Sequence, residues 1–82
     1  MTDFPLDPEL VVHAGQERVL RSVEDARTFV RDAMKQYPKA RWQAVFRRLD
    51  SVHTQEDAEE AGDAVRELLA SEGLLRAEIK RV

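Results

Sequence analysis

The chain has 82 residues, enough for one small domain, and its 43% hydrophobic and 35% charged residues are typical of a folded chain with well-solvated outer faces. It contains no cysteine, which excludes disulfides, thiolate chemistry and cysteine-based zinc sites. No apolar stretch approaches the ~20 residues that cross a bilayer, and residues 1–5 lack the pattern of a signal peptide, so we expect a cytoplasmic protein.

Charge is separated along the chain, although the net charge is only −3. Between residues 27 and 48, seven basic residues stand against one acid, Asp32. Between residues 49 and 73, eight acids stand against one basic residue, Arg66. This pattern indicates two surfaces of opposite charge, which could meet each other or an oppositely charged partner.

The N-terminal segment predicts an extended arm followed by a β-hairpin. Residues 1–9 contain two prolines and no periodic pattern, which is typical of an arm. Residues 10–21 hold two β-like runs on either side of Gly15, and glycine accepts the positive φ of a tight turn without steric cost. We therefore expect a hairpin over residues 10–21.

Three helices are predicted over residues 22–37, 40–52 and 54–72, because apolar residues recur there at steps of three and four. Ser22 and Thr54 are each followed three residues later by an acid, as in helix N-caps. Pro38 favours an end to the first helix and Gly73 an end to the third. Small residues around Gly62 indicate that another helix crosses there.

The C-terminal residues 75–81 alternate between apolar and polar, which predicts a half-buried strand. An isolated hairpin is marginal in water, so we expect this strand to join it. The sequence thus predicts a single α+β domain over residues 1–82, with a small antiparallel sheet and three helices packed on one of its faces.

The chain resembles a family of short bacterial proteins catalogued as domain of unknown function 982. The resemblance rests on the segment 10–12 with Gly15, on residues 22–26, on the Tyr37-Pro38 pair and on the apolar spacing of residues 64–73. Tyr37 stands where the family usually has tryptophan, and a glycine after Pro38 and a cysteine in the second helix are missing. The resemblance implies a fold and a bacterial setting, but no activity, cofactor or functional residue.

The first candidate site is a row of basic residues at helical spacing, extended beyond Pro38: Arg27, Arg31, Lys35, Lys39 and Arg41. Such a row could bind an acidic partner or phosphates. It also borders the apolar face, where the stems of basic side chains usually cover the core edge, and the acidic third helix is a ready counterpart within the chain. The net negative charge and the lack of an RNA-binding signature argue against nucleic acid.

The other candidates have structural explanations in the sequence. The acids of residues 56–67 lie along one convex helix face rather than in a cleft, so we expect no metal site. His53 has acids nearby, but Ser22 and Thr54 are explained as caps, which leaves no nucleophile for catalysis. Trp42, Tyr37 and Phe46 stand at core spacing, and we expect no cofactor or small-molecule ligand.

The function expected from the sequence is a non-enzymatic protein-interaction or accessory module. Its partner would be an acidic protein or a second copy, docked head to tail through the basic and acidic helices or through an exposed sheet edge. The alternatives are a small nucleic-acid-binding protein that uses the first helix, and a minor enzyme with a site near His53.

Overall fold

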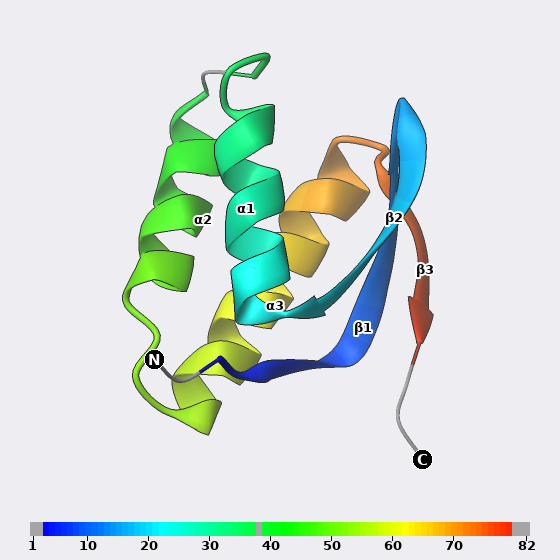
Figure 1. Cartoon of the computed structure of the whole chain (residues 1–82). Helices are drawn as coiled ribbons and strands as arrows, with labels where there is room; N and C mark the ends of the chain where they lie inside the picture. The colour runs from blue at the N-terminus through cyan, green and yellow to red at the C-terminus, as the bar shows by residue number, and fades with distance from the viewer. Residues whose placement is uncertain (1–2, 38, 80–82) are drawn as a thin grey trace.

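The computed structural model describes residues 3–37 and 39–79 and has an α+β fold, with the strands on one side and the helices on the other (Figure 1). The elements follow one another as β1 (Pro5–Ala14), β2 (Gln16–Ser22), α1 (Val23–Ala33), α2 (Ala40–Asp50), α3 (Gln55–Ser71) and β3 (Leu75–Ile79).

Strands β1 and β2 form the expected hairpin. Leu10 is paired with Leu20, and the turn is made by Gly15, whose φ of 86° lies in the region that glycine adopts without strain. The hairpin prediction is confirmed, but its bounds of 10–21 were too narrow at the start.

Strand β1 begins at Pro5, so the extended arm expected over residues 1–9 was wrong for residues 5–9. Pro5 pairs with Ser22, and the register then shifts before Leu10. The residues between Pro5 and Leu10 have no regular partner on β2, and this irregularity hides the alternation that marks a strand. The prolines fit because proline is confined to edges and irregularities of a sheet. The backbone carbonyl of Phe4 accepts a hydrogen bond from Val23 N (2.8 Å), which holds the segment against α1.

Strand β3 pairs antiparallel with β1, and the strand order is β2-β1-β3. Its pairs include Glu9 with Ile79 and Val11 with Ala77. The expected third strand is thus confirmed over residues 75–79, and residues 80 and 81 lie outside the described part of the chain.

The three helices are confirmed, but each is shorter than the periodicity predicted. Ser22 and Thr54 precede their helices with extended backbone, as caps do. Helix α1 ends at Ala33 rather than residue 37, and the chain continues in turns. Tyr37 keeps its apolar spacing because its N–H still donates to Ala33 O (2.8 Å). Residues 51 and 52, expected in the second helix, follow the end of α2.

Both predicted N-caps are present. Ser22 Oγ accepts from Asp25 N at 3.2 Å, and Thr54 Oγ1 accepts from Asp57 N at 3.1 Å. Each acid in turn accepts from a backbone N–H just before the cap, Arg21 N for Asp25 and His53 N for Asp57. These bonds satisfy backbone donors that a helix start leaves unpaired.

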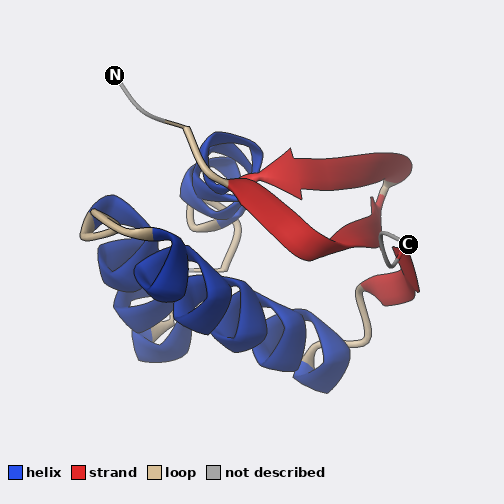
Figure 2. Cartoon of the chain, turned by 90° about the horizontal axis from the view of Figure 1, so that it is seen from below, coloured by secondary structure: helices blue, strands red, loops and turns tan. Residues whose placement is uncertain are grey.

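The core lies between the sheet and the helices (Figure 2). Helices α1 and α3 contact the strands, whereas α2 packs mainly on α1 and α3. The helix expected to cross near Gly62 is a strand instead, because the nearest neighbour of a Cβ built there is Leu6 Cδ2 of β1, at 3.3 Å. The small residues of α3 therefore admit the start of β1, which the sequence pattern had hidden.

Candidate functional site

The basic residues expected in one row are spread over two helices and the turn between them. Arg27 and Arg31 lie on α1, but Lys35 lies in the turn that follows it, because α1 ends at Ala33. Lys39 is the N-cap residue of α2 and Arg41 lies in its first turn. The prediction that Arg27, Arg31 and Lys35 all project from one side of the first helix is therefore wrong, because Lys35 lies outside α1.

Arg27 makes two ion pairs within the chain. Its Nη2 lies 2.8 Å from Glu24 Oε2 on the same helix, and its Nη1 lies 3.1 Å from Asp50 Oδ1 at the end of α2. The hydrogen bond and charge of Glu24, followed by those of Asp50, raise the pKa of the Arg27 guanidinium above its ordinary value. Arg27 thus joins α1 to α2 and already has two acidic partners.

Lys39 and Arg31 also have acidic partners. Lys39 Nζ lies 3.5 Å from Glu72 Oε1, and the Glu72 side chain is only 18% exposed. The same oxygen accepts a hydrogen bond from Trp42 Nε1 (3.3 Å), so Lys39 completes a contact between α2 and the end of α3. Arg31 Nε lies 3.8 Å from the neighbouring Asp32 Oδ1, with both side chains exposed.

Arg41 and Arg48 line grooves between α2 and α3. Arg41 shares one groove with Glu67, and Arg48 shares the next with Glu60, Asp63 and Glu67. The acidic helix is therefore the neighbour of these basic side chains within the same chain. This arrangement is typical of a solvated boundary between two helices rather than of a binding surface.

His53 and the hydroxyls near it serve the start of α3. The His53 backbone N–H donates to Asp57 Oδ2, and its side chain is exposed. Thr54 Oγ1 is occupied as the cap acceptor. Among residues 3–37 and 39–79, no group of three or more His, Asp or Glu side chains is placed to hold a metal ion.

Trp42 belongs to the core, as its spacing predicted. The side chain is fully buried, and its ring stacks on Tyr37 with centroids 5.5 Å apart and planes 12° from parallel. Phe46 packs partly buried against the same core. The three aromatic residues thus belong to the hydrophobic core and its edge.

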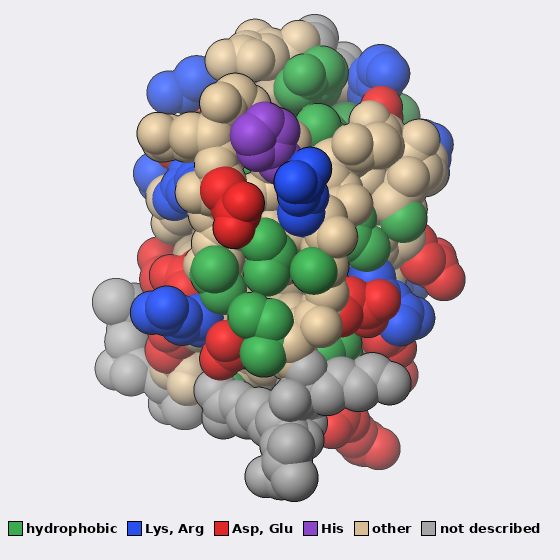
Figure 3. Space-filling model, turned by 90° about the vertical axis from the view of Figure 1, so that its right-hand side faces the viewer, with side chains coloured by type: hydrophobic (Ala, Val, Ile, Leu, Met, Phe, Trp, Pro, Cys, Tyr) green, Lys and Arg blue, Asp and Glu red, His purple; other side chains and the backbone are tan. Residues whose placement is uncertain are grey.

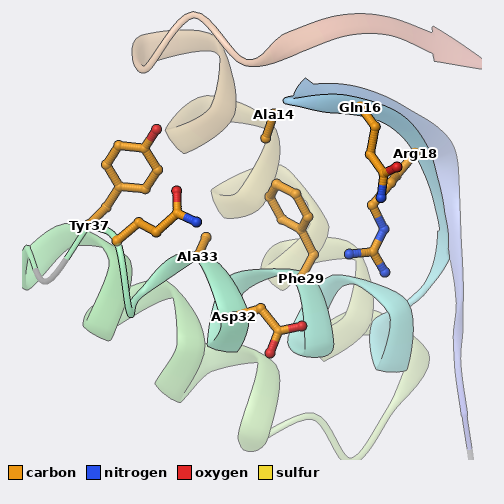
Figure 4. A pocket seen from close by; sticks show the side chains of 8 residues that line it. Ala14, Gln16, Arg18, Phe29, Asp32, Ala33 and Tyr37 are labelled. Atoms are coloured by element: carbon orange, nitrogen blue, oxygen red, sulfur yellow. The ribbon is translucent and has the colours of Figure 1, made fainter.

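A small hollow lies between the hairpin and α1 (Figure 4). Phe29 stands in it between Tyr37 and Arg18, and the Arg18 guanidinium lies 5.8 Å from the Phe29 ring centroid, a cation–π distance. Its volume is about 130 Å³, below the ~300–1,000 Å³ of ligand pockets. The hollow can admit one side chain but cannot enclose a substrate.

The sheet face turned away from the helices carries an apolar centre. We define the outer face by four residues: Val11, Val19, Ala77 and Ile79. Val11 is 7% exposed yet lies outside the core cluster, which contains its neighbours Leu10 and Val12. Successive side chains of a strand point to opposite faces, so Val11 and its paired residues Val19 and Ala77 point outward.

Both signs of charge surround this centre (Figure 3). On β2, Glu17 and Arg21 stand two residues before and two residues after Val19, so all three point to the outer face. Ile79, at the end of β3, is 46% exposed and is the one exposed large hydrophobic residue among those described. The outer face thus has an apolar strip at its centre, with charges of both signs around it (Figure 3).

The outer face is absent from the predictions made from the sequence, although the sequence contains a signal for it. Val11-Val12 and Val19-Leu20 are each two consecutive apolar residues in a strand. Because side chains alternate, one of each pair points away from the core. Two such pairs on one hairpin indicate an apolar strip on the face that the helices leave open.

No protein-family model, curated protein or solved structure matches the chain. Within residues 3–37 and 39–79, none of the helices combines the length and the apolar character needed to cross a bilayer.

Proposed function

We propose that this chain is a non-enzymatic protein-interaction module that docks through the outer face of its sheet. The observation that carries the proposal is the apolar strip of Val11, Val19, Ala77 and Ile79, which lies on the opposite side of the sheet from the helices. Apolar side chains of a sheet face gain stability when a second layer covers them. The partner is a protein surface with an apolar centre and charges of both signs around it.

The charges around the strip favour a protein over nucleic acid or a membrane. Glu17 and Arg21 flank the strip with opposite signs, whereas surfaces that bind phosphates present clustered basic residues. The basic residues that the sequence singled out do not form such a cluster, because Arg27, Arg31 and Lys39 each lie beside an acid.

The edges of the sheet are less suited to docking than its face. On β2, the Arg21 N–H already donates to Asp25 Oδ2 (3.1 Å) and is not available to an added strand. On the other side, β3 has five residues and its register shifts opposite Val11 and Val12. Short and irregular edge strands are features that oppose strand addition.

The proposal assigns no reaction to the chain. The hydroxyls of Ser22 and Thr54 accept cap hydrogen bonds, and His53 is exposed beside the start of α3. The cytoplasmic and bacterial setting expected from the sequence belongs to the same proposal.

Capture experiments with matched variants test the proposal. Tagged wild type, Val19→Lys and Ile79→Lys are incubated with extract of cells that produce the protein, and the retained proteins are identified by mass spectrometry. The control is Ala70→Lys, which adds the same charge at an exposed position of α3. Circular dichroism and thermal melting show whether each variant is folded.

The expected result is a protein that wild type and Ala70→Lys retain and that both outer-face variants lose. Loss is expected because a charged side chain in an apolar contact has to be desolvated. Retention of the same proteins by all four chains, or by none, would contradict docking through this face.

A further inference from the structure

We infer that the partner of the outer face is a second copy of this chain, related to the first by a two-fold axis; this inference rests on the proposed function. The outward-facing side chains of β2 are, in order, an acid, an apolar residue and a base: Glu17, Val19 and Arg21. A second copy of β2 that runs in the opposite direction presents a base opposite the acid, an apolar residue opposite the apolar residue, and an acid opposite the base.

The position of the axis follows from the register of the sheet. Val11 is the pairing partner of both Val19 and Ala77, so the three form one apolar row across all three strands. A two-fold axis in the plane of the contact and along this row places each strand over its own copy, running in the opposite direction. Val19 then lies over Val19 of the copy, as an isologous interface requires.

The same rotation pairs the charges. Glu17 lies over Arg21 of the copy, and Arg21 lies over Glu17 of the copy, because the two residues stand at equal distances from Val19 on β2. Rotation about an axis along the strands would instead bring β2 over β3 and leave these charges without each other. The charge order therefore selects one of the two face-to-face arrangements.

Glu17 and Arg21 do not pair within one chain. They are four positions apart on a strand, which separates their Cα atoms by about 13 Å. No ion pair of either side chain is found within residues 3–37 and 39–79. Both charges are thus available to a second molecule.

The size of the face predicts a weak dimer. Three strands of about five residues give a contact of roughly 14 Å by 17 Å. Such a contact falls in the class that buries less than about 1,200 Å² in total, to which transient complexes belong. We expect a reversible dimer with a dissociation constant of about 10 μM to 1 mM.

Charge exchange between two variants tests the arrangement. Sedimentation equilibrium is measured at about 50 mM salt, where exposed charges are least screened, for wild type, Glu17→Arg, Arg21→Glu, their 1:1 mixture and the double variant. Each single variant sets like charges against each other twice in a homodimer. In the mixture and in the double variant, every acid again faces a base.

The expected result is that each single variant dimerises about tenfold or more weakly than wild type, since two attractive pairs become repulsive. The mixture and the double variant are expected to regain wild-type association within about threefold. Arg47→Glu, the same change of charge at an exposed position of α2, is expected to dimerise like wild type.

The outcomes separate this inference from the proposed function. If wild type stays fully monomeric at about 1 mM, where even the weakest dimer expected would hold about half of the chains, the second copy is not the partner, and the capture experiment decides the proposed function independently. Two results would overturn the two-fold arrangement in a dimer that Val19→Lys weakens. Either the single charge variants dimerise as strongly as wild type, or the 1:1 mixture of the two variants shows no recovery of association. A dimer that also survives Val19→Lys and Ile79→Lys would use another surface of the chain, which would contradict the second copy as the partner of the outer face and again leave the proposed function to the capture experiment.

Discussion

Leu6 ties the N-terminal segment of the chain to helix α3. Its side chain is 2% exposed, and it packs at Gly62, where an added Cβ would lie 3.3 Å from Leu6 Cδ2. The segment that carries Leu6 has no strand periodicity. Its place in the core is therefore evident from this contact and not from the sequence pattern.

Leu6→Ala is expected to lower the free energy of unfolding by about 2–5 kcal/mol, the range for removing a buried leucine side chain. Urea denaturation followed by circular dichroism measures the change. Gln43→Ala, at an exposed position of α2, is the control and is expected to change stability by less than about 0.5 kcal/mol. A loss at Leu6 as small as that of the control would show that the segment is a dispensable arm.

Gly62→Ala tests the same contact from the other side. Alanine in a helix is favoured over glycine by about 1 kcal/mol, but its Cβ crowds Leu6. We expect Gly62→Ala to be more favourable in the Leu6→Ala background than in wild type, because the crowding methyl groups are gone. Unfolding free energies of the four chains give the coupling, and additivity of the two changes would contradict the contact.

The helices illustrate which features of an element the sequence encodes locally. Ser22 and Thr54 start their helices with an acid three residues later, a pattern visible in the sequence and confirmed by the cap hydrogen bonds. The end of α1 is not encoded in this way, because apolar spacing continues through the turns to Tyr37. Periodicity reports which residues face the core, and turns with nearly helical geometry keep that periodicity.

Thr54→Ala is expected to destabilise the protein by about 0.5–2 kcal/mol, as the loss of an N-cap does. The reason is that Asp57 N loses its acceptor at the start of α3. Thermal or urea unfolding measures the effect, with Gln55→Ala as the control at the adjacent exposed position. Thr54→Ser retains the hydroxyl and is expected to keep most of the stability; equal losses for serine and alanine would contradict the cap assignment.

At the scale of the whole molecule, ion pairs join part of the basic segment 27–48 to acids elsewhere in the fold. Arg27 joins acids of α1 and α2, Lys39 reaches Glu72, and Arg66 joins α3 to Glu78 of β3 at 3.4 Å. Sequence order alone could not assign these pairs, because they depend on how the helices pack. The outer face also depends on the tertiary fold, since it combines the N-terminal hairpin with β3 from the other end of the described chain.

Because Arg27, Arg31 and Lys39 already lie beside acids, we expect no binding of short DNA or RNA duplexes at about 50 mM salt, where electrostatic association is strongest. Fluorescence anisotropy with labelled duplexes measures it. Binding that falls steeply with added salt and is lost in Arg41→Glu would instead support the nucleic-acid alternative.

The central position of β1 also affects the order in which the chain can fold. Glu9 pairs with Ile79, so the sheet joins residues 70 positions apart, and closing so long a loop has an entropic cost that local contacts do not have. The hairpin and the helices involve nearer residues and can form before β3 arrives. While the chain is being synthesised, strand β1 therefore has one open edge until residues 75–79 emerge, and in that interval it is most exposed to pairing with another unfinished chain.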